Sequence, residues 1–129
     1  FREGSGTMRF GGGAFDGRYS AGSRFEEEPG TNPEELLAAA HAGCFSMAFT
    51  LGLNRAGFEP EEFRTTADVH IERGESGFRI TRIELKTRAR VPGIDQGTFM
   101  GQAEAAAKGC TVSQLFQGAE ISLDAQLES

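Results

Sequence analysis

The sequence has 129 residues, of which 38% are hydrophobic, and it carries a formal net charge of −6. This length provides one domain's worth of chain with enough apolar material for a core. The excess of acidic residues argues against nucleic acid or an anionic membrane as the main partner, and we find neither an apolar run expected to span a bilayer nor a secretory signal.

Two cysteines are too few for a disulfide scaffold and fit an intracellular redox pair, so we expect a cytoplasmic protein. The hydrophobic content is modest for a chain with so much apolar helical sequence. This combination favours a core that is completed by a second copy of the chain.

Residues 1–30 are rich in glycine, which interrupts two short extended stretches at 7–10 and 14–20. We expect these stretches to form a hairpin or a meander of short strands. Three consecutive glycines at 11–13 can suggest a phosphate-binding loop, but no GK[ST] motif follows and no helix begins there. A flexible turn is the better interpretation.

Residues 31–58 predict one long helix. Asn32 can cap it, Pro33 suits its first position, Glu35 follows the cap by three residues, and Gly57 is suited to end it. Nearly all residues between are apolar or small, so we expect the helix to be buried on most sides. One stripe that we expect to be packed, and that carries the thiol, recurs at helical spacing and consists of Leu36, Ala40, Cys44, Met47 and Leu51.

Two strands are predicted after this helix. Residues 65–73 alternate apolar and polar side chains, and residues 78–91 do the same with one phase change between Ile80 and Ile83, which indicates a bulge. Glycines at 74 and 77 supply the turn between them. We therefore expect an antiparallel hairpin with one solvated face.

Asp95 can cap a second helix that Gly109 would end, and residues 113–116 indicate a further helical turn. Residues 120–128 alternate again and predict a final strand. The order of short strands, long central helix, β-hairpin, helix and strand predicts a single α+β domain over residues 1–129, with helices packed on an antiparallel sheet.

A lone cysteine such as Cys44 is most often a small, inert, buried side chain. Its context here, GTNPEELLAAAHAGCFSMA, is joined much later by a second cysteine in KGCTVSQLF. Together with TTADVHIER, RITRIELKTRARVPGID and EISLDAQLES, these segments resemble the OsmC/Ohr family of thiol peroxidases, and its OsmC branch in particular. The resemblance covers nearly everything from Arg24 onward. It implies an intertwined homodimer that needs no cofactor, and a further strand ahead of Phe1.

The resemblance also implies the roles of four residues. Cys44 would attack a hydroperoxide, and Cys110 would resolve the resulting sulfenic acid as an intramolecular disulfide, which a dithiol of lipoyl type would reduce. Arg24 would reach the thiol, lower its pKa and bind a peroxide oxygen, and Glu34 would hold that arginine. Arg18 is a weaker rival for the arginine.

Helix geometry adds an expectation about assembly. Glu34 precedes Cys44 by ten residues, which corresponds to about 15 Å of rise along one straight helix. Glu34 therefore cannot lie beside Cys44 of its own chain. We expect it to reach Cys44 of another subunit together with Arg24, which would make the active site a feature of the dimer interface.

Several alternatives remain open at this point. The protein could be a thiol–disulfide exchanger or redox sensor, or a small-molecule-binding dimer with inert thiols. His41 lies three residues before Cys44 and could touch it or join Cys110 at a metal, although a structural zinc site normally needs four ligands.

His70 falls on a polar strand face. We expect mostly core positions for a set of large apolar side chains, Phe45, Met47, Phe49, Phe99 and Phe116.

Overall fold

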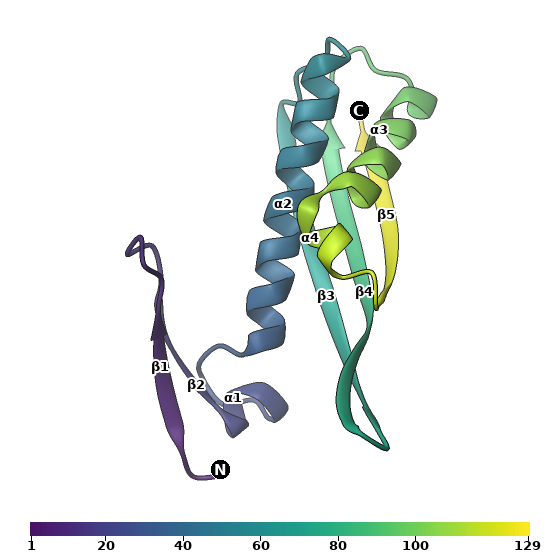
Figure 1. Ribbon diagram of the computed structural model, residues 1–129. Coiled ribbons are helices and arrows are strands. Elements are labelled where there is room, and N and C mark those ends of the chain that lie inside the picture. Colours follow the sequence, from purple (N-terminus) through teal and green to yellow (C-terminus); the bar gives the residue numbers. More distant parts are fainter. The chain divides into compact units, whose positions relative to one another are not determined.

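The computed structural model describes all residues from 1 to 129, and they form two compact units, residues 1–37 and residues 38–129 (Figure 1). The long helix α2 (Pro33–Arg55) begins in the first unit and ends in the second. The prediction of a single domain over residues 1–129 stays a prediction.

The first unit contains the predicted N-terminal hairpin. Strands β1 (Ser5–Arg9) and β2 (Asp16–Ser20) pair antiparallel, with Ser5 opposite Ser20 and Arg9 opposite Asp16. The loop between them is closed by backbone hydrogen bonds in which Phe10 accepts from Gly13 and donates to Phe15. Gly13 has a φ of 77°, a left-handed conformation that glycine adopts without steric cost.

A short helix that the sequence analysis did not predict follows this hairpin. Helix α1 (Ala21–Phe25) begins with a capping box, because the Ser20 hydroxyl accepts from the Ser23 N–H at 3.0 Å and the Ser23 hydroxyl accepts from the Ser20 N–H at 2.8 Å. Ser23 also donates to the Thr31 carbonyl at 2.8 Å, which fastens α1 to the segment ahead of α2.

The predicted signals at both ends of α2 are confirmed. The Asn32 side chain accepts from the Glu35 N–H at 2.7 Å, and Gly57 has a φ of 92° just beyond the last turn. The predicted buried stripe is wrong, however, because Met47 is 77% exposed and Leu51 is 50% exposed. The buried residues are instead His41, Phe45, Phe49 and Leu53.

The second unit is built on a three-stranded sheet in the order β3–β4–β5. Strands β3 (Glu62–Gly74) and β4 (Gly77–Arg90) form the predicted antiparallel hairpin. His70 pairs with Arg82 whereas Ile71 pairs with Ile80, so the register skips one residue of β4. This shift confirms the bulge that the phase change predicted.

Strand β5 (Glu120–Glu128) pairs with β4 in parallel, so the expectation of an antiparallel sheet is wrong for this strand. The reason lies in the connection. The chain leaves β4, crosses over through two helices and returns to the end at which β4 began, and a strand reached by such a crossover runs parallel to its neighbour.

The crossover contains helices α3 (Gln96–Gly109) and α4 (Thr111–Leu115). Asp95 caps α3 as predicted, accepting from the Thr98 N–H at 2.9 Å. Gly109 was predicted to end α3 from the position after its last residue, and it is instead the last residue of that helix. Cys110 serves both helices, as the C-cap of α3 and the N-cap of α4.

One face of the sheet carries the hydrophobic core, and α2 and α3 lie on that same face (Figure 1). Phe49 lies at its centre, with its ring 5.5, 5.2 and 5.3 Å from those of Phe45, Phe63 and Phe99. The other face of the sheet is polar, and Lys86 and Asp68 form an exposed ion pair there at 3.8 Å. The predicted solvated face is thus confirmed.

Helix α2 is long and apolar enough, by length and composition alone, to cross a membrane, with a mean hydropathy of 1.6 over its most apolar window. The expectation that the chain has no such run is therefore wrong. The core helix of a soluble protein passes the same test, and one face of α2 packs on the sheet with no exposure at Phe45 or Phe49.

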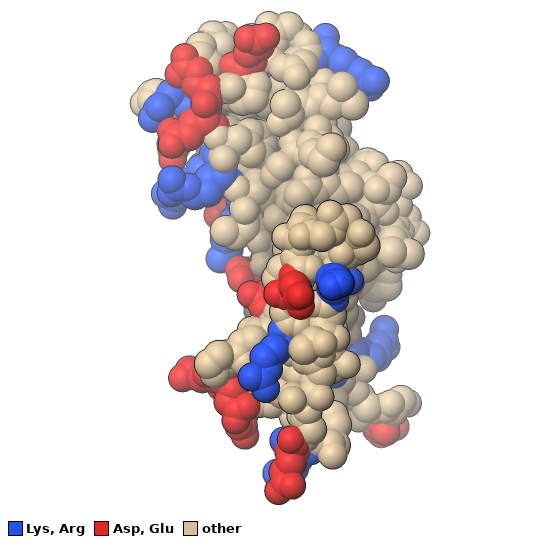
Figure 2. Space-filling model, turned by 90° about the vertical axis from the view of Figure 1, so that its left-hand side faces the viewer, with Lys and Arg blue, Asp and Glu red and all other residues tan.

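Charged side chains of both signs lie intermingled on the face that Figure 2 shows, with no large area of one sign. A continuous basic surface is the usual electrostatic requirement for binding nucleic acid. This face does not supply one.

Candidate active site

Cys44 lies in the middle of α2, and its thiol meets the start of α4. The Cys44 sulfur is 3.5 Å from the hydroxyl oxygen of Thr111. The thiol also takes part in hydrogen bonds with the backbone of Thr111 and Val112 and with the side chain of Cys110. Cys44 is half-buried, so the sulfur combines several polar contacts with partial access to solvent.

These contacts lower the pKa of the Cys44 thiol below its ordinary value. Burial by itself would raise this pKa, because a thiolate loses hydration in a less polar environment. The hydrogen bonds from Thr111, Val112 and Cys110 outweigh that effect, since they stabilise the thiolate more than the thiol. A cysteine with a lowered pKa and partial exposure has the properties of a reactive thiol.

The structure brings the two cysteines together, although 66 positions separate them in the sequence. Both are free thiols. Cys110 is 2% exposed, and its sulfur accepts from the Ser113 N–H at 3.3 Å in the manner of an N-cap. One thiol is thus partly accessible and the other is buried behind it.

His41 and Ser113 continue this cluster into the interior. Nε2 of His41 lies 2.7 Å from the Ser113 hydroxyl, and that hydroxyl lies 3.1 Å from the Cys110 sulfur. The His41 ring also meets the edge of Phe116 at 5.5 Å between centroids. His41 therefore reaches Cys110 through a serine. Its position in the sequence had left open a direct contact with Cys44 or a metal site, and the structure gathers no three His, Cys, Asp or Glu side chains that could hold a metal.

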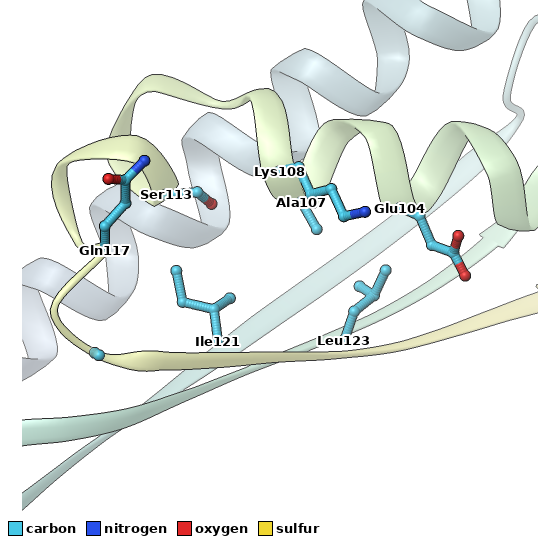
Figure 3. Close-up of a pocket in the computed structure, with 8 residues that line it drawn as sticks. Glu104, Ala107, Lys108, Ser113, Gln117, Ile121 and Leu123 are labelled. Atoms are coloured by element: carbon cyan, nitrogen blue, oxygen red, sulfur yellow. The ribbon is translucent and has the colours of Figure 1, made fainter.

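A groove of about 460 Å³ runs beside this cluster between β5 and the helices α3 and α4 (Figure 3). Ile121 and Leu123 point from β5 toward the helices, while Glu104 and Lys108 carry charge at the helical side. Ser113 lies on the groove wall, so the groove approaches the interior end of the thiol cluster.

Arg24 and Glu34 form a bidentate ion pair within the first unit. Nε of Arg24 is 2.7 Å from Oε1 of Glu34, and its NH2 is 2.9 Å from Oε2. The hydrogen bond to Glu34 raises the pKa of Arg24, against the opposing effect of burial. The guanidinium also lies over the Phe25 ring at 5.1 Å. Glu34 therefore holds Arg24, as the family resemblance implied, and the role of this pair at a thiol stays a prediction.

Sequence reasoning missed two features of this site. The first is Thr111 as the hydroxyl nearest the Cys44 sulfur, for which adjacency to Cys110 was the available signal. The second is Ser113, whose position three residues after Cys110 is the spacing of an N-cap with its bonded N–H.

Comparison with known proteins places this chain in a family. A family model described as OsmC-like protein matches residues 25–125. The chain is 55% identical over 111 residues to the Escherichia coli protein named Peroxiredoxin OsmC, an alignment that covers 86% of this chain and 77% of that protein.

Solved structures show the same fold at lower identity. An OsmC-like protein of unknown function from Vibrio cholerae superposes with a TM-score of 0.78 at 18% identity, covering 94% of this chain and 83% of the other. A Legionella pneumophila protein described as an organic hydroperoxide resistance protein OsmC superposes with a TM-score of 0.74 at 21% identity, covering 95% and 94%. The sequence resemblance and the α+β fold are thereby confirmed, and the chain belongs to the OsmC-like family.

Proposed function

We propose that this protein is a thiol-dependent peroxidase that reduces organic hydroperoxides, with hydrogen peroxide as a second substrate, in defence against oxidative stress. The observation that carries the proposal is the contact between Cys44, whose pKa is lowered, and the buried thiol of Cys110. The names of the relatives support it, since one is a peroxiredoxin and another an organic hydroperoxide resistance protein.

The reaction proceeds in two covalent steps. The Cys44 thiolate attacks one oxygen of the hydroperoxide, the O–O bond breaks, and the departing alkoxide takes up a proton and leaves as an alcohol. Cys110 then attacks the sulfenic sulfur of Cys44. The S–S bond forms as the S–O bond breaks, and the hydroxide takes up a proton and leaves as water. No cofactor is needed, because a dithiol reductant of lipoyl type reduces the disulfide by exchange.

The Arg24–Glu34 pair has a role in binding the peroxide in this proposal. A guanidinium that is permanently charged can bind a peroxide oxygen and stabilise the thiolate. Helix rise keeps Glu34 away from Cys44 of its own chain. We therefore assign the pair to the active site of the second subunit in a homodimer.

The surface of α2 supports that dimer. A helix that is apolar on all sides is normally buried on all sides, yet this chain leaves Met47 77% exposed and Leu51 50% exposed. A second copy of the helix is the natural cover for this apolar face. We propose that α2 is an interface helix of a cytoplasmic protein and that both units belong to one domain, since the family match runs across the boundary between them.

A thiol count tests the proposal. The reduced protein is treated with one equivalent of cumene hydroperoxide, and free thiols are counted before and after in the wild type and in Cys44→Ser and Cys110→Ser variants. We expect rapid loss of both thiols in the wild type and no loss in Cys44→Ser. In Cys110→Ser we expect a Cys44 sulfenic acid, which a further equivalent of hydroperoxide converts to the sulfinic acid.

Other outcomes separate the rival functions. Thiols that persist in excess hydroperoxide but react with a small disulfide would indicate a thiol–disulfide exchanger. Thiols that resist both reagents would refute redox chemistry and leave a binding protein.

A further inference from the structure

The proposed reaction assigns no role to one buried titratable group, the imidazole of His41. His41 has no exposed surface, and its Nδ1 has no hydrogen-bond partner. Burying an imidazole with an unsatisfied nitrogen costs free energy, so its retention in the core needs a compensating contact. Its one hydrogen bond, from Nε2 to Ser113, leads directly to Cys110.

Once Cys44 is a sulfenic acid, it is no longer the thiolate to which the Cys110 thiol donates, and Cys110, Ser113 and His41 then form a hydrogen-bonded chain that can take two arrangements. In the first, the Cys110 thiol donates to the Ser113 hydroxyl, which donates to Nε2 of a neutral His41. In the second, the Ser113 hydroxyl donates to a Cys110 thiolate, and Nε2 of a protonated His41 donates to Ser113. The two differ by the transfer of one proton from sulfur to imidazole.

We propose that Ser113 and His41 act as a proton relay that activates Cys110 for its attack on the Cys44 sulfenic acid. As the bond between the two sulfurs forms, the Cys110 proton passes to Ser113 and the Ser113 proton passes to Nε2 of His41. The S–O bond of Cys44 breaks, and the leaving hydroxide takes a proton from solvent to become water. The imidazolium later returns its proton to solvent. The inference rests on the proposed two-cysteine mechanism.

Burial explains why the chain needs such a relay. Cys110 is 2% exposed and Ser113 is 4% exposed, so the thiol cannot give its proton directly to bulk water. Apart from Cys44, which is the group under attack in this step, the groups hydrogen-bonded to its sulfur that can accept a proton are the Ser113 hydroxyl and, through it, the imidazole. Ser113 lines the groove, which offers a route by which the proton can leave afterwards.

The protonation state of His41 fits this task. Burial lowers its pKa, so the ring is neutral at pH 7 and Nε2 is free to accept. The titratable groups that its hydrogen bonds reach are Cys110, through Ser113, and then Cys44, which is hydrogen-bonded to Cys110. The ring also makes a T-shaped contact with Phe116.

The test measures oxidation and resolution separately by rapid quench. Oxidation is followed by dimedone trapping of the Cys44 sulfenic acid, and resolution by disulfide formation, between pH 6 and 8.5. We expect Ser113→Ala and His41→Gln to leave oxidation unchanged but to slow resolution by about 100-fold at pH 7, the usual contribution of a positioned general base. Their resolution rates should also rise about tenfold per pH unit, because only a thiolate formed by solvent can then attack.

Matched variants separate a relay from a structural role. Ser113→Thr keeps the hydroxyl and should restore resolution, while His70→Gln and Ser122→Ala make the same changes elsewhere and should affect neither step. An unchanged rate of Cys44 oxidation shows that the site is folded. Resolution within threefold of the wild type in both Ser113→Ala and His41→Gln, across the whole pH range, would overturn the relay.

A second arm keeps the relay distinct from the peroxidase proposal. In a Cys44→Ser background, Cys110 is the one thiol left, and its reaction with methyl methanethiolsulfonate should slow on adding Ser113→Ala or His41→Gln. If the wild type forms no disulfide with hydroperoxide, the peroxidase proposal fails together with the role of the relay in resolution, and a response in this arm would show only that Ser113 and His41 activate the Cys110 thiol. If disulfide forms but resolution is unchanged in Ser113→Ala and His41→Gln, the relay fails alone.

Discussion

At the scale of single residues, hydrogen bonds within one unit already lower the pKa of the Cys44 thiol. The sequence alone suggested that a positive charge from Arg24 was required. The structure shows that Thr111, Val112 and Cys110 already lower the pKa of the Cys44 thiol against the effect of burial. The arginine is thus left with the binding of the peroxide as its main proposed task.

Removing the Thr111 hydroxyl should expose this contribution. Thr111→Val keeps the side-chain shape but loses the 3.5 Å contact to sulfur, so the pKa of Cys44 should rise. A hydrogen bond to a charged group contributes about 1.5 kcal/mol, so alkylation of Cys44 by iodoacetamide at pH 6.5 should slow by about tenfold. Well above both pKa values the variant and the wild type should react alike, because both are then thiolates.

The control for this change is Thr66→Val, on the solvated face of β3, which should leave the alkylation profile unchanged. If the pH at which the alkylation rate of Cys44 rises is unchanged in Thr111→Val, the backbone donors of α4 alone stabilise the thiolate.

At the scale of elements, the end of α2 depends on one backbone conformation. Gly57 has a φ of 92°, whereas Gly101 lies inside α3 with open space where a side chain would project. Gly57→Ala should lower the free energy of unfolding by about 1 kcal/mol, because a β-carbon is strained at that φ. Gly101→Ala should raise it by about 0.5–1 kcal/mol through helix propensity. Chemical denaturation measures the free energy of unfolding of both variants, and changes of the same sign in the two would contradict this prediction.

Most elements could be predicted because their signals are local. Alternation identified β3, β4 and β5, and caps identified α2 and α3. Helix α1 was missed because its five residues, AGSRF, carry no apolar period and are held by serine contacts. The direction of β5 was missed because the alternation of apolar and polar residues is the same in a parallel and an antiparallel strand. The crossover connection from β4 determines that β5 is parallel.

The site was predicted less completely, for a physical reason. Helix α2 is apolar on nearly every side, so periodicity could not select the face that packs on the sheet, and Met47 was assigned to the core in error. The contacts of Cys44 with Thr111, and of His41 with Ser113, join residues 67 and 72 positions apart. No local pattern specifies such pairs. The two cysteines and the Arg24–Glu34 pair were recognised through the family resemblance.

At the scale of the whole molecule, assembly should be inseparable from activity. Leu51→Glu places a charge on the exposed apolar face of α2 and should convert a dimer into a monomer, as measured by sedimentation equilibrium. Peroxidase activity should fall at least 100-fold with it, because Arg24 and Glu34 would no longer reach the thiol of another subunit. Ser122→Glu, on the solvated face of β5, is the matched control and should remain dimeric and active. A fully active monomer would refute an active site shared between subunits.

The parallel pairing of β4 and β5 has a consequence for co-translational folding on the ribosome. Strand β4 emerges early and pairs with β3, but its second edge has no neighbour until the stretch from 91 to 119 and then β5 have been synthesised. During that interval an apolar edge centred on Ile83 and Leu85 is open to other chains. Nascent chains of this protein should therefore depend on holding chaperones until synthesis has passed β5, and crowded polysomes are where misassembly would begin.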